Sequence, residues 1–149
     1  MICYITHRKS PDFLYEPGQN VANSWSSLHR NLELDLKDKI QRWYDEVKDF
    51  PAKNVVSFSI EGTDDGATVG HYTQLVWGNT EYVGCGAIYY KDGNTNASSY
   101  PFRQTLICNY HPPGNYLGKP VYIIGHAGSA CHQANNDNKN GINKNGLCP

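Results

Sequence analysis

Two strand-like segments, each with a cysteine inside it, constrain the fold of this chain more than any other feature. The segments are YVGCGAIYYKD (82–92) and RQTLICNYH (103–111), and both are rich in β-branched and aromatic side chains. The polar stretch GNTNASSYPF between them begins with a Gly-Asn turn signal, which favours an antiparallel hairpin. We therefore predict a hairpin whose two arms are joined by a disulfide between Cys85 and Cys108.

The cysteines as a set indicate an oxidising compartment. They are Cys3, Cys85, Cys108, Cys131 and Cys148. The absence of a Cys-x-x-Cys pair argues against a zinc ribbon or a thioredoxin-like site. Cys131 and Cys148 bracket an Asn/Gly/Lys-rich loop, whose closure by a disulfide is worth roughly 3 kcal/mol. The two local pairs predict a disulfide framework and leave Cys3 without a partner.

Composition excludes several classes of protein. The chain has 149 residues, 13 Lys and Arg against 14 Asp and Glu, and no basic stripe, so nucleic-acid binding is not expected. No apolar run approaches the roughly 18 residues of a transmembrane segment, so we expect one soluble domain. The Asn96-Ala97-Ser98 sequon agrees with secretion. Because no signal peptide follows Met1, we expect the N-terminus to be incomplete.

The strongest helix signal covers residues 33–50. An apolar stripe at spacings of four, three and four residues is formed by Leu36, Ile40, Trp43 and Val47, and Pro51 ends the pattern. Glu46 lies at the flank of this stripe, where its carboxylate can point into a cleft. A second, shorter helix is predicted in GATVGHYTQLVW (66–77).

The remaining segments give weaker signals. Residues 8–20 contain two prolines and a glycine and are predicted to be a loop. VYIIG (121–125) has the composition of a last short strand, whereas the chain from Ser129 onward is too polar to bury much surface. For His71, three roles remain open at this point: a metal ligand, a general base or a hydrogen-bonded structural imidazole. A serine hydrolase is not expected, because no Gly-x-Ser-x-Gly elbow is present.

Two of these segments carry a family resemblance. GHYTQLVWGNT (70–80) and TLICNYHPPGNY (105–116) resemble the signature segments of the CAP superfamily, which comprises cysteine-rich secretory proteins, antigen 5 and pathogenesis-related 1 proteins. The second segment departs from the pattern only at Thr105, where an apolar residue is usual. CYITH (3–7) and Gly-Gln-Asn (18–20) resemble the antigen 5 branch of arthropod venom and saliva. The resemblance extends from about Cys3 to about Gly125.

The resemblance implies a fold and a site. It implies an α/β fold, namely a three-layer α-β-α sandwich with an antiparallel sheet that here lacks its first helix. The CAP domain would cover 1–125, and 126–149 would form a disulfide-closed C-terminal extension. The cleft residues of the family map onto His7, Gln19, Glu46 and His71, with Zn²⁺ binding implied for the two histidines. Because an amide replaces a carboxylate at Gln19, we expect weaker metal binding than in relatives with Glu.

The resemblance also implies a function. We expect a secreted, extracellular and monomeric protein of the venom or salivary type, which binds small ligands such as lipids, or host proteins, without being an enzyme or requiring a cofactor. A zinc-dependent hydrolase that uses His7, His71 and Glu46 is an alternative. A sterol or fatty-acid carrier is another.

Overall fold

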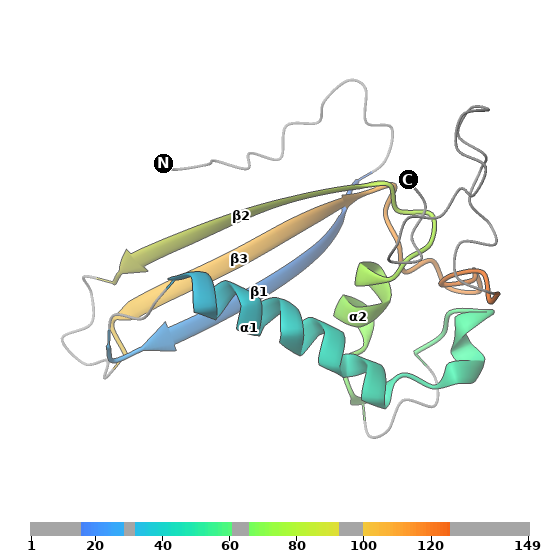
Figure 1. The fold of residues 1–149 in the computed structure, drawn as a ribbon, viewed down its shortest axis with the longest axis horizontal. Helices are drawn as coiled ribbons and strands as arrows, with labels where there is room; N and C mark the ends of the chain where they lie inside the picture. The colour runs from blue at the N-terminus through green and yellow to red at the C-terminus, as the bar shows by residue number, and fades with distance from the viewer. Residues whose placement is uncertain (1–15, 29–31, 61–65, 93–99, 126–149) are drawn as a thin grey trace, which may run out of the picture.

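A computed structural model describes residues 16–28, 32–60, 66–92 and 100–125 of this chain, and Figure 1 shows their arrangement. The elements in chain order are β1 (Gly18–Ser26), α1 (Leu32–Asp45), the 3₁₀ turns η1 (Glu46–Asp49) and η2 (Ala52–Val55), α2 (Gly70–Leu75), β2 (Tyr82–Lys91) and β3 (Phe102–His111). The predictions for Cys3, His7, Asn96 and the Cys131–Cys148 loop lie outside the described residues. Within the described ranges, no helix is long and apolar enough to cross a bilayer.

The three strands form one antiparallel sheet in the order β1-β3-β2. Cys85 lies opposite Cys108 in the register of β2 and β3, and the two form a disulfide, so the predicted hairpin is confirmed. The prediction of a loop over 8–20 is wrong at its end, because Gly18–Asn20 are the first residues of β1. β1 pairs with β3 over its whole length, from Gly18 opposite Tyr110 to Ser26 opposite Phe102.

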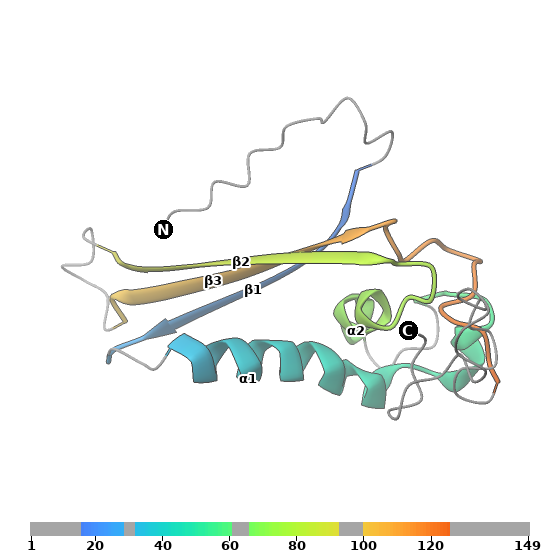
Figure 2. The same ribbon diagram turned by 45° about the horizontal axis from the view of Figure 1, so that its top comes forward.

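Both helices lie on the same side of the sheet (Figure 2). On central strand β3 the side chains of Gln104, Leu106, Cys108 and Tyr110 are buried, whereas those between them are half-buried. Because side chains alternate between the two faces of a strand, the buried set marks the face that the helices cover. The fold is therefore α/β with an antiparallel sheet, as predicted, and the described residues supply the sheet and one helical layer.

The buried stripe of α1 differs from the predicted one. Trp43 is buried, but Ile40 and Val47 are 43% and 38% exposed. Lys39 is buried instead, with 4% exposure. Its ammonium donates to Ser24 Oγ on β1 and to Gln104 Oε1 on β3, both at 2.6 Å. The sheet therefore offers α1 polar acceptors, which allow a lysine to be buried with its hydrogen bonds formed.

The apolar core has two parts. One lies between α1 and the sheet and consists of Trp43, Leu106, Cys108 and Tyr110. The other lies at the end of the molecule that carries α2 and consists of Phe50, Val55, Phe58, Val69, Tyr72, Trp77 and Val121. The predicted last strand over 121–125 is wrong, because this segment forms no strand. Val121 is buried and its N–H donates to the Val55 carbonyl, whereas Ile123 and Ile124 are exposed.

Buried amide side chains join α2 to the segment after β3. Gln74 Oε1 accepts the backbone N–H of Gly114 at 2.9 Å, and Thr73 Oγ1 donates to Asn115 Oδ1 at 2.7 Å. Asn115 Nδ2 in turn donates to the Gly70 carbonyl. These contacts join the segments 70–80 and 105–116, because each segment satisfies buried polar groups of the other.

Gly114→Ala tests this tight junction. A Cβ at position 114 would lie 2.7 Å from Trp77 Cγ and 2.9 Å from Gln74 Nε2, and the Trp77 ring is buried. We expect the free energy of unfolding, measured by urea titration, to fall by about 1–3 kcal/mol because the packed ring cannot move away freely.

Gly84→Ala on β2 is the matched control, because nothing lies within 4 Å of a Cβ built there. This variant should unfold within about 0.5 kcal/mol of the parent. Equal effects of the two substitutions would show that the junction around Gly114 is not tightly packed.

Candidate functional site

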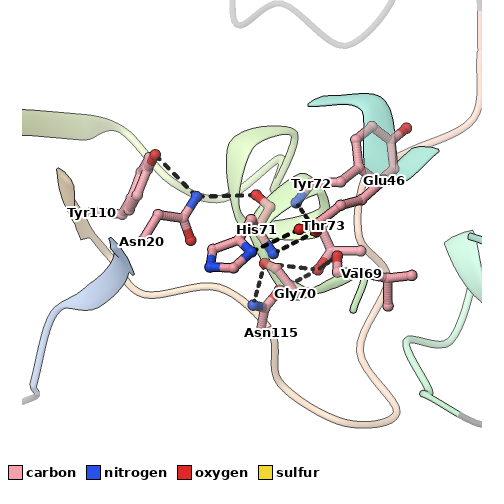
Figure 3. Close-up of polar contacts among 9 residues, drawn as sticks. All are labelled: Asn20, Glu46, Val69, Gly70, His71, Tyr72, Thr73, Tyr110 and Asn115. Atoms are coloured by element: carbon pink, nitrogen blue, oxygen red, sulfur yellow. Dashed lines mark hydrogen bonds and ion pairs between the residues drawn. The ribbon is translucent and has the colours of Figure 1, made fainter. Parts of the chain in front are cut away.

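The Glu46 carboxylate lies at the start of α2 and contacts three donors there (Figure 3). Its Oε2 accepts the backbone N–H groups of His71 and Tyr72, each at 3.0 Å. Its Oε1 lies 2.7 Å from His71 Nδ1. The side chains of His71 and Glu46 are 31% and 15% exposed, so the pair lies at the surface of the core and not deep within it.

Local helix chemistry explains this contact. The first backbone N–H groups of a helix have no partner within the helix and attract negative charge. Val69, the residue before α2, forms no side-chain cap. Glu46 supplies the missing acceptor from η1, the turn that follows α1, and so fixes α2 against the end of α1. The prediction that the Glu46 carboxylate points into a cleft stays a prediction, because Glu46 is not among the residues that line a cavity in the described part of the chain.

The contact with Glu46 also assigns the His71 tautomer. An ionised carboxylate only accepts hydrogen bonds, so neutral His71 carries its proton on Nδ1 and leaves the lone pair on Nε2. The Trp43 ring stacks on the imidazole at a centroid distance of 5.8 Å and an interplanar angle of 15°. The ring of His71 is thus held at its edge and on its face, with one basic nitrogen available to accept a hydrogen bond, a proton or a metal ion.

Asn20 connects this site to the sheet. Its Nδ2 donates to the His71 carbonyl at 3.0 Å and to the Tyr110 hydroxyl at 3.3 Å, and its side chain is buried. Burial raises the pKa of Tyr110, while the hydrogen bond from Asn20 acts in the opposite direction with a smaller effect. The sequence indicated Asn20 only as part of the Gly-Gln-Asn segment, because a buried amide on a strand leaves no hydrophobic pattern.

Gln19 lies apart from Glu46 and His71. It is exposed and donates to Asn109 Oδ1 at 2.8 Å on the neighbouring strand. Since adjacent residues of a strand point to opposite faces and Asn20 faces α2, Gln19 lies on the other face of the sheet. The structure thus brings together two of the four predicted cleft residues, Glu46 and His71. His7 is outside the described residues.

A metal site is not complete within the described residues. No three His, Cys, Asp or Glu side chains there lie close enough together to hold an ion. Zinc sites in proteins use three or four protein ligands as a rule. The described part of the site offers one imidazole nitrogen, Nε2 of His71, so zinc binding would depend on His7 and stays a prediction.

A cavity of about 370 Å³ lies beside Trp43, the residue that stacks on His71. Its walls come from α1, α2 and the adjoining ends of β2 and β3. They include Ile40, Leu75, Trp77, Val83, Tyr110 and the Cys85–Cys108 disulfide. Trp77 packs in the core beside α2 and also borders the cavity.

Glu46→Ala tests the carboxylate contact. The variant leaves two backbone N–H groups and the His71 imidazole without their acceptor, so the free energy of unfolding should fall by about 1–3 kcal/mol. Long-range ¹H–¹⁵N spectra of the imidazole should show the Nδ1–H tautomer in the parent and a loss of that preference in the variant.

Asp45→Ala is the control, since the neighbouring carboxylate contacts the Gln41 side chain at the surface and not His71. It should leave the tautomer unchanged. An Nδ1–H tautomer that persists in Glu46→Ala would contradict the assignment.

A second prediction concerns alkaline pH. Burial raises the pKa of Tyr72, with a further contribution from Tyr122, and burial raises that of Tyr110. The unfolded chain releases these protons near pH 10, before the folded chain does. The contribution of these two tyrosines to the free energy of unfolding should therefore be fully present below about pH 10. It should decline as the pH rises through their pKa values in the folded chain.

Urea unfolding between pH 8 and 11.5 measures this decline. Tyr110→Phe removes one of the two groups and should make the loss of stability with pH shallower. A decline as steep as that of the parent would show that Tyr110 titrates alike in both states.

Comparison with known proteins agrees with the fold. Residues 4–110 match the model of the cysteine-rich secretory protein family, CAP. Venom allergen 5 of Polistes gallicus is 44% identical over 108 residues, which cover 72% of this chain and 46% of the relative. Salivary antigen-5 of Dipetalogaster maximus is 36% identical over 151 positions, which cover 98% of this chain and 53% of the relative. This chain thus spans about half the length of these relatives.

Solved structures give the same result. The crystal structure of Na-ASP-1 superimposes with a TM-score of 0.67 at 26% identity, over 99% of this chain and 33% of that one. The structure of NaASP2 with Zn²⁺ superimposes with a TM-score of 0.59 at 27% identity, over 90% of this chain and 60% of that one. The resemblance seen in the two signature segments is therefore confirmed, and the chain belongs to the cysteine-rich secretory protein, or CAP, family.

Proposed function

We propose that this chain is part of a secreted, antigen 5-like protein that acts without catalysis and binds a small apolar ligand in the cavity beside Trp43. The observation that carries the proposal is the cavity itself, which is about 370 Å³ in volume and bordered mainly by apolar side chains. Pockets for small ligands in proteins have this size and this character.

Several walls of the cavity are buried or covalently joined. Cys108 and Tyr110 are buried on the central strand, and Cys108 is covalently joined to β2 through Cys85. Trp43 is fixed between the sheet and the His71 ring. A preformed wall lowers the entropy lost on binding, so apolar contact area translates more directly into affinity.

The surroundings of the Glu46–His71 pair argue against covalent catalysis by this pair. The pair resembles a base with its orienting carboxylate, and covalent catalysis with such a base needs a side-chain nucleophile within reach. The nearby hydroxyl of Thr73 is fully buried and donates its one proton to Asn115 Oδ1 at 2.7 Å. No described hydroxyl or thiol contacts the His71 ring in the manner of a catalytic pair.

The zinc-dependent hydrolase remains the second candidate, because the Glu46 contact leaves Nε2 of His71 free to bind a metal ion. Zinc titration followed by assays with ester and peptide substrates separates the two functions. Zinc-dependent turnover that is lost in His71→Ala would replace the scaffold function by the hydrolase. Zinc binding without turnover would agree with the scaffold.

The proposal of secretion is supported by the relatives, which are proteins of venom and saliva, and by the Cys85–Cys108 disulfide, which is typical of extracellular proteins.

We also propose that 126–149 is a separate extension closed by Cys131 and Cys148. Peptide mapping of the natural secretion without reduction tests both, and it should recover the two disulfide-linked peptide pairs. Recovery of reduced peptides from the cytosol alone would contradict secretion.

Ile40→Glu tests the cavity. Ile40 borders the cavity but is 43% exposed, so a charge there should interfere with the ligand while the fold persists. We expect 1-decanol, a neutral probe below its solubility limit, to change the tryptophan fluorescence of the parent and to bind at least tenfold more weakly to the variant.

Ile88→Glu is the matched control, with the same substitution at 48% exposure on the uncovered face of the sheet. It should bind the probe like the parent. The proposed binding site would be contradicted if the parent showed no saturable change in fluorescence. Equal weakening of 1-decanol binding by both substitutions would also contradict it.

A further inference from the structure

The cavity beside Trp43 contains one charged side chain, Glu81, among the described residues that line it. Resting on the proposed function, we infer that the cavity selects apolar molecules that carry an ammonium group and discriminates against those that carry a carboxylate. The basis is the charge of the described lining residues, which include one acidic residue and no basic one.

Glu81 lies where the chain enters β2. Its backbone N–H donates to the His111 carbonyl at 3.0 Å, which fixes the residue beside the end of β3. Thr80 and Tyr82 on either side of it also border the cavity. Its carboxylate forms no ion pair with another described residue. Among the described residues that line the cavity, Glu81 therefore supplies a negative charge that no described cation neutralises.

The rest of the lining favours a cation as well. Three buried aromatic residues border the cavity, namely Trp43, Trp77 and Tyr110. The faces of aromatic rings attract ammonium groups, and sites that combine several rings with a carboxylate are suited to substituted amines. The described lining contains no lysine, arginine or histidine, so a ligand carboxylate would find no opposite charge there.

This charge balance changes the expectation for lipids. A free fatty acid would place its carboxylate either beside Glu81 or against the apolar wall, and both positions are unfavourable because like charges repel and an unpaired charge resists desolvation. A single-chain amine or quaternary ammonium compound of the same length would instead gain an opposite charge. Among single-chain ligands, the cavity should therefore prefer the amines.

The size of the preference follows from the position of Glu81. The residue is exposed, so water and salt weaken its attraction for a ligand, and exposed ion pairs contribute modestly. We expect decyltrimethylammonium to bind about three- to tenfold more tightly than decanoate at low ionic strength, with 1-decanol between them. The difference should shrink in 0.5 M salt, where charges are strongly screened.

The experiment compares these three ten-carbon probes by isothermal titration calorimetry with the 149-residue chain. The two charged probes are kept below their micelle concentrations, and 1-decanol is kept below its solubility limit. Glu81→Gln keeps the size of the side chain and removes its charge. It should weaken decyltrimethylammonium binding about three- to tenfold and leave 1-decanol unchanged. Glu16→Gln is the control, because Glu16 is an exposed carboxylate outside the cavity, and it should alter none of the three.

The outcomes separate the inference from the proposed function. If 1-decanol binds but decanoate equals or exceeds decyltrimethylammonium, or if Glu81→Gln leaves the ratio unchanged, the ligand class is wrong and the cavity still binds apolar molecules. If none of the three probes binds, the proposed function fails and the inference fails with it. A preference for the ammonium probe that Glu81→Gln abolishes supports the inference.

Discussion

The contact between the Glu46 carboxylate and the first turn of α2 determines how the rest of the site is arranged. It supplies acceptors to two backbone N–H groups and to the His71 imidazole at once. Because Glu46 follows directly after α1, the contact joins the two helices on the covered face of the sheet. Trp43, one turn earlier on α1, then lies against the His71 ring and forms one wall of the cavity. One carboxylate therefore links the conformation of the histidine with the shape of the cavity.

Local sequence patterns predicted the elements whose stabilising contacts are local. The hairpin of Cys85 and Cys108 and the helix that ends before Pro51 were predicted because alternation and helical spacing appear within each segment. β1 was missed because its sequence GQNVANSWS buries an amide, Asn20, and shows no alternating hydrophobic pattern. The face of the sheet on which Gln19 lies could not be predicted either, because a side chain can be assigned to a face only after its strand is known.

Long-range partners explain the other differences. Lys39 is buried on α1 because its acceptors, Ser24 and Gln104, lie 15 and 65 residues away in the sequence. No pattern within the helix reveals such acceptors, so the stripe of apolar residues appeared to include Ile40, which instead borders the cavity. The family resemblance assigned Glu46 and His71 to one cleft, but their direct contact was seen only in the structure. The cavity, which is formed by α1, α2 and both hairpin strands, required the structure.

The central claim is that the face of the protein beside Trp43, and not the uncovered face of the sheet, receives an apolar ligand. Chemical-shift mapping of methyl groups during titration with decyltrimethylammonium tests it most directly. The account predicts saturable shifts at Ile40, Leu75 and Val83, which border the cavity, and none at Val21 or Ile88 on the opposite face. Shifts centred on Val21 and Ile88, or no saturable shift at any of these methyl groups, would contradict it.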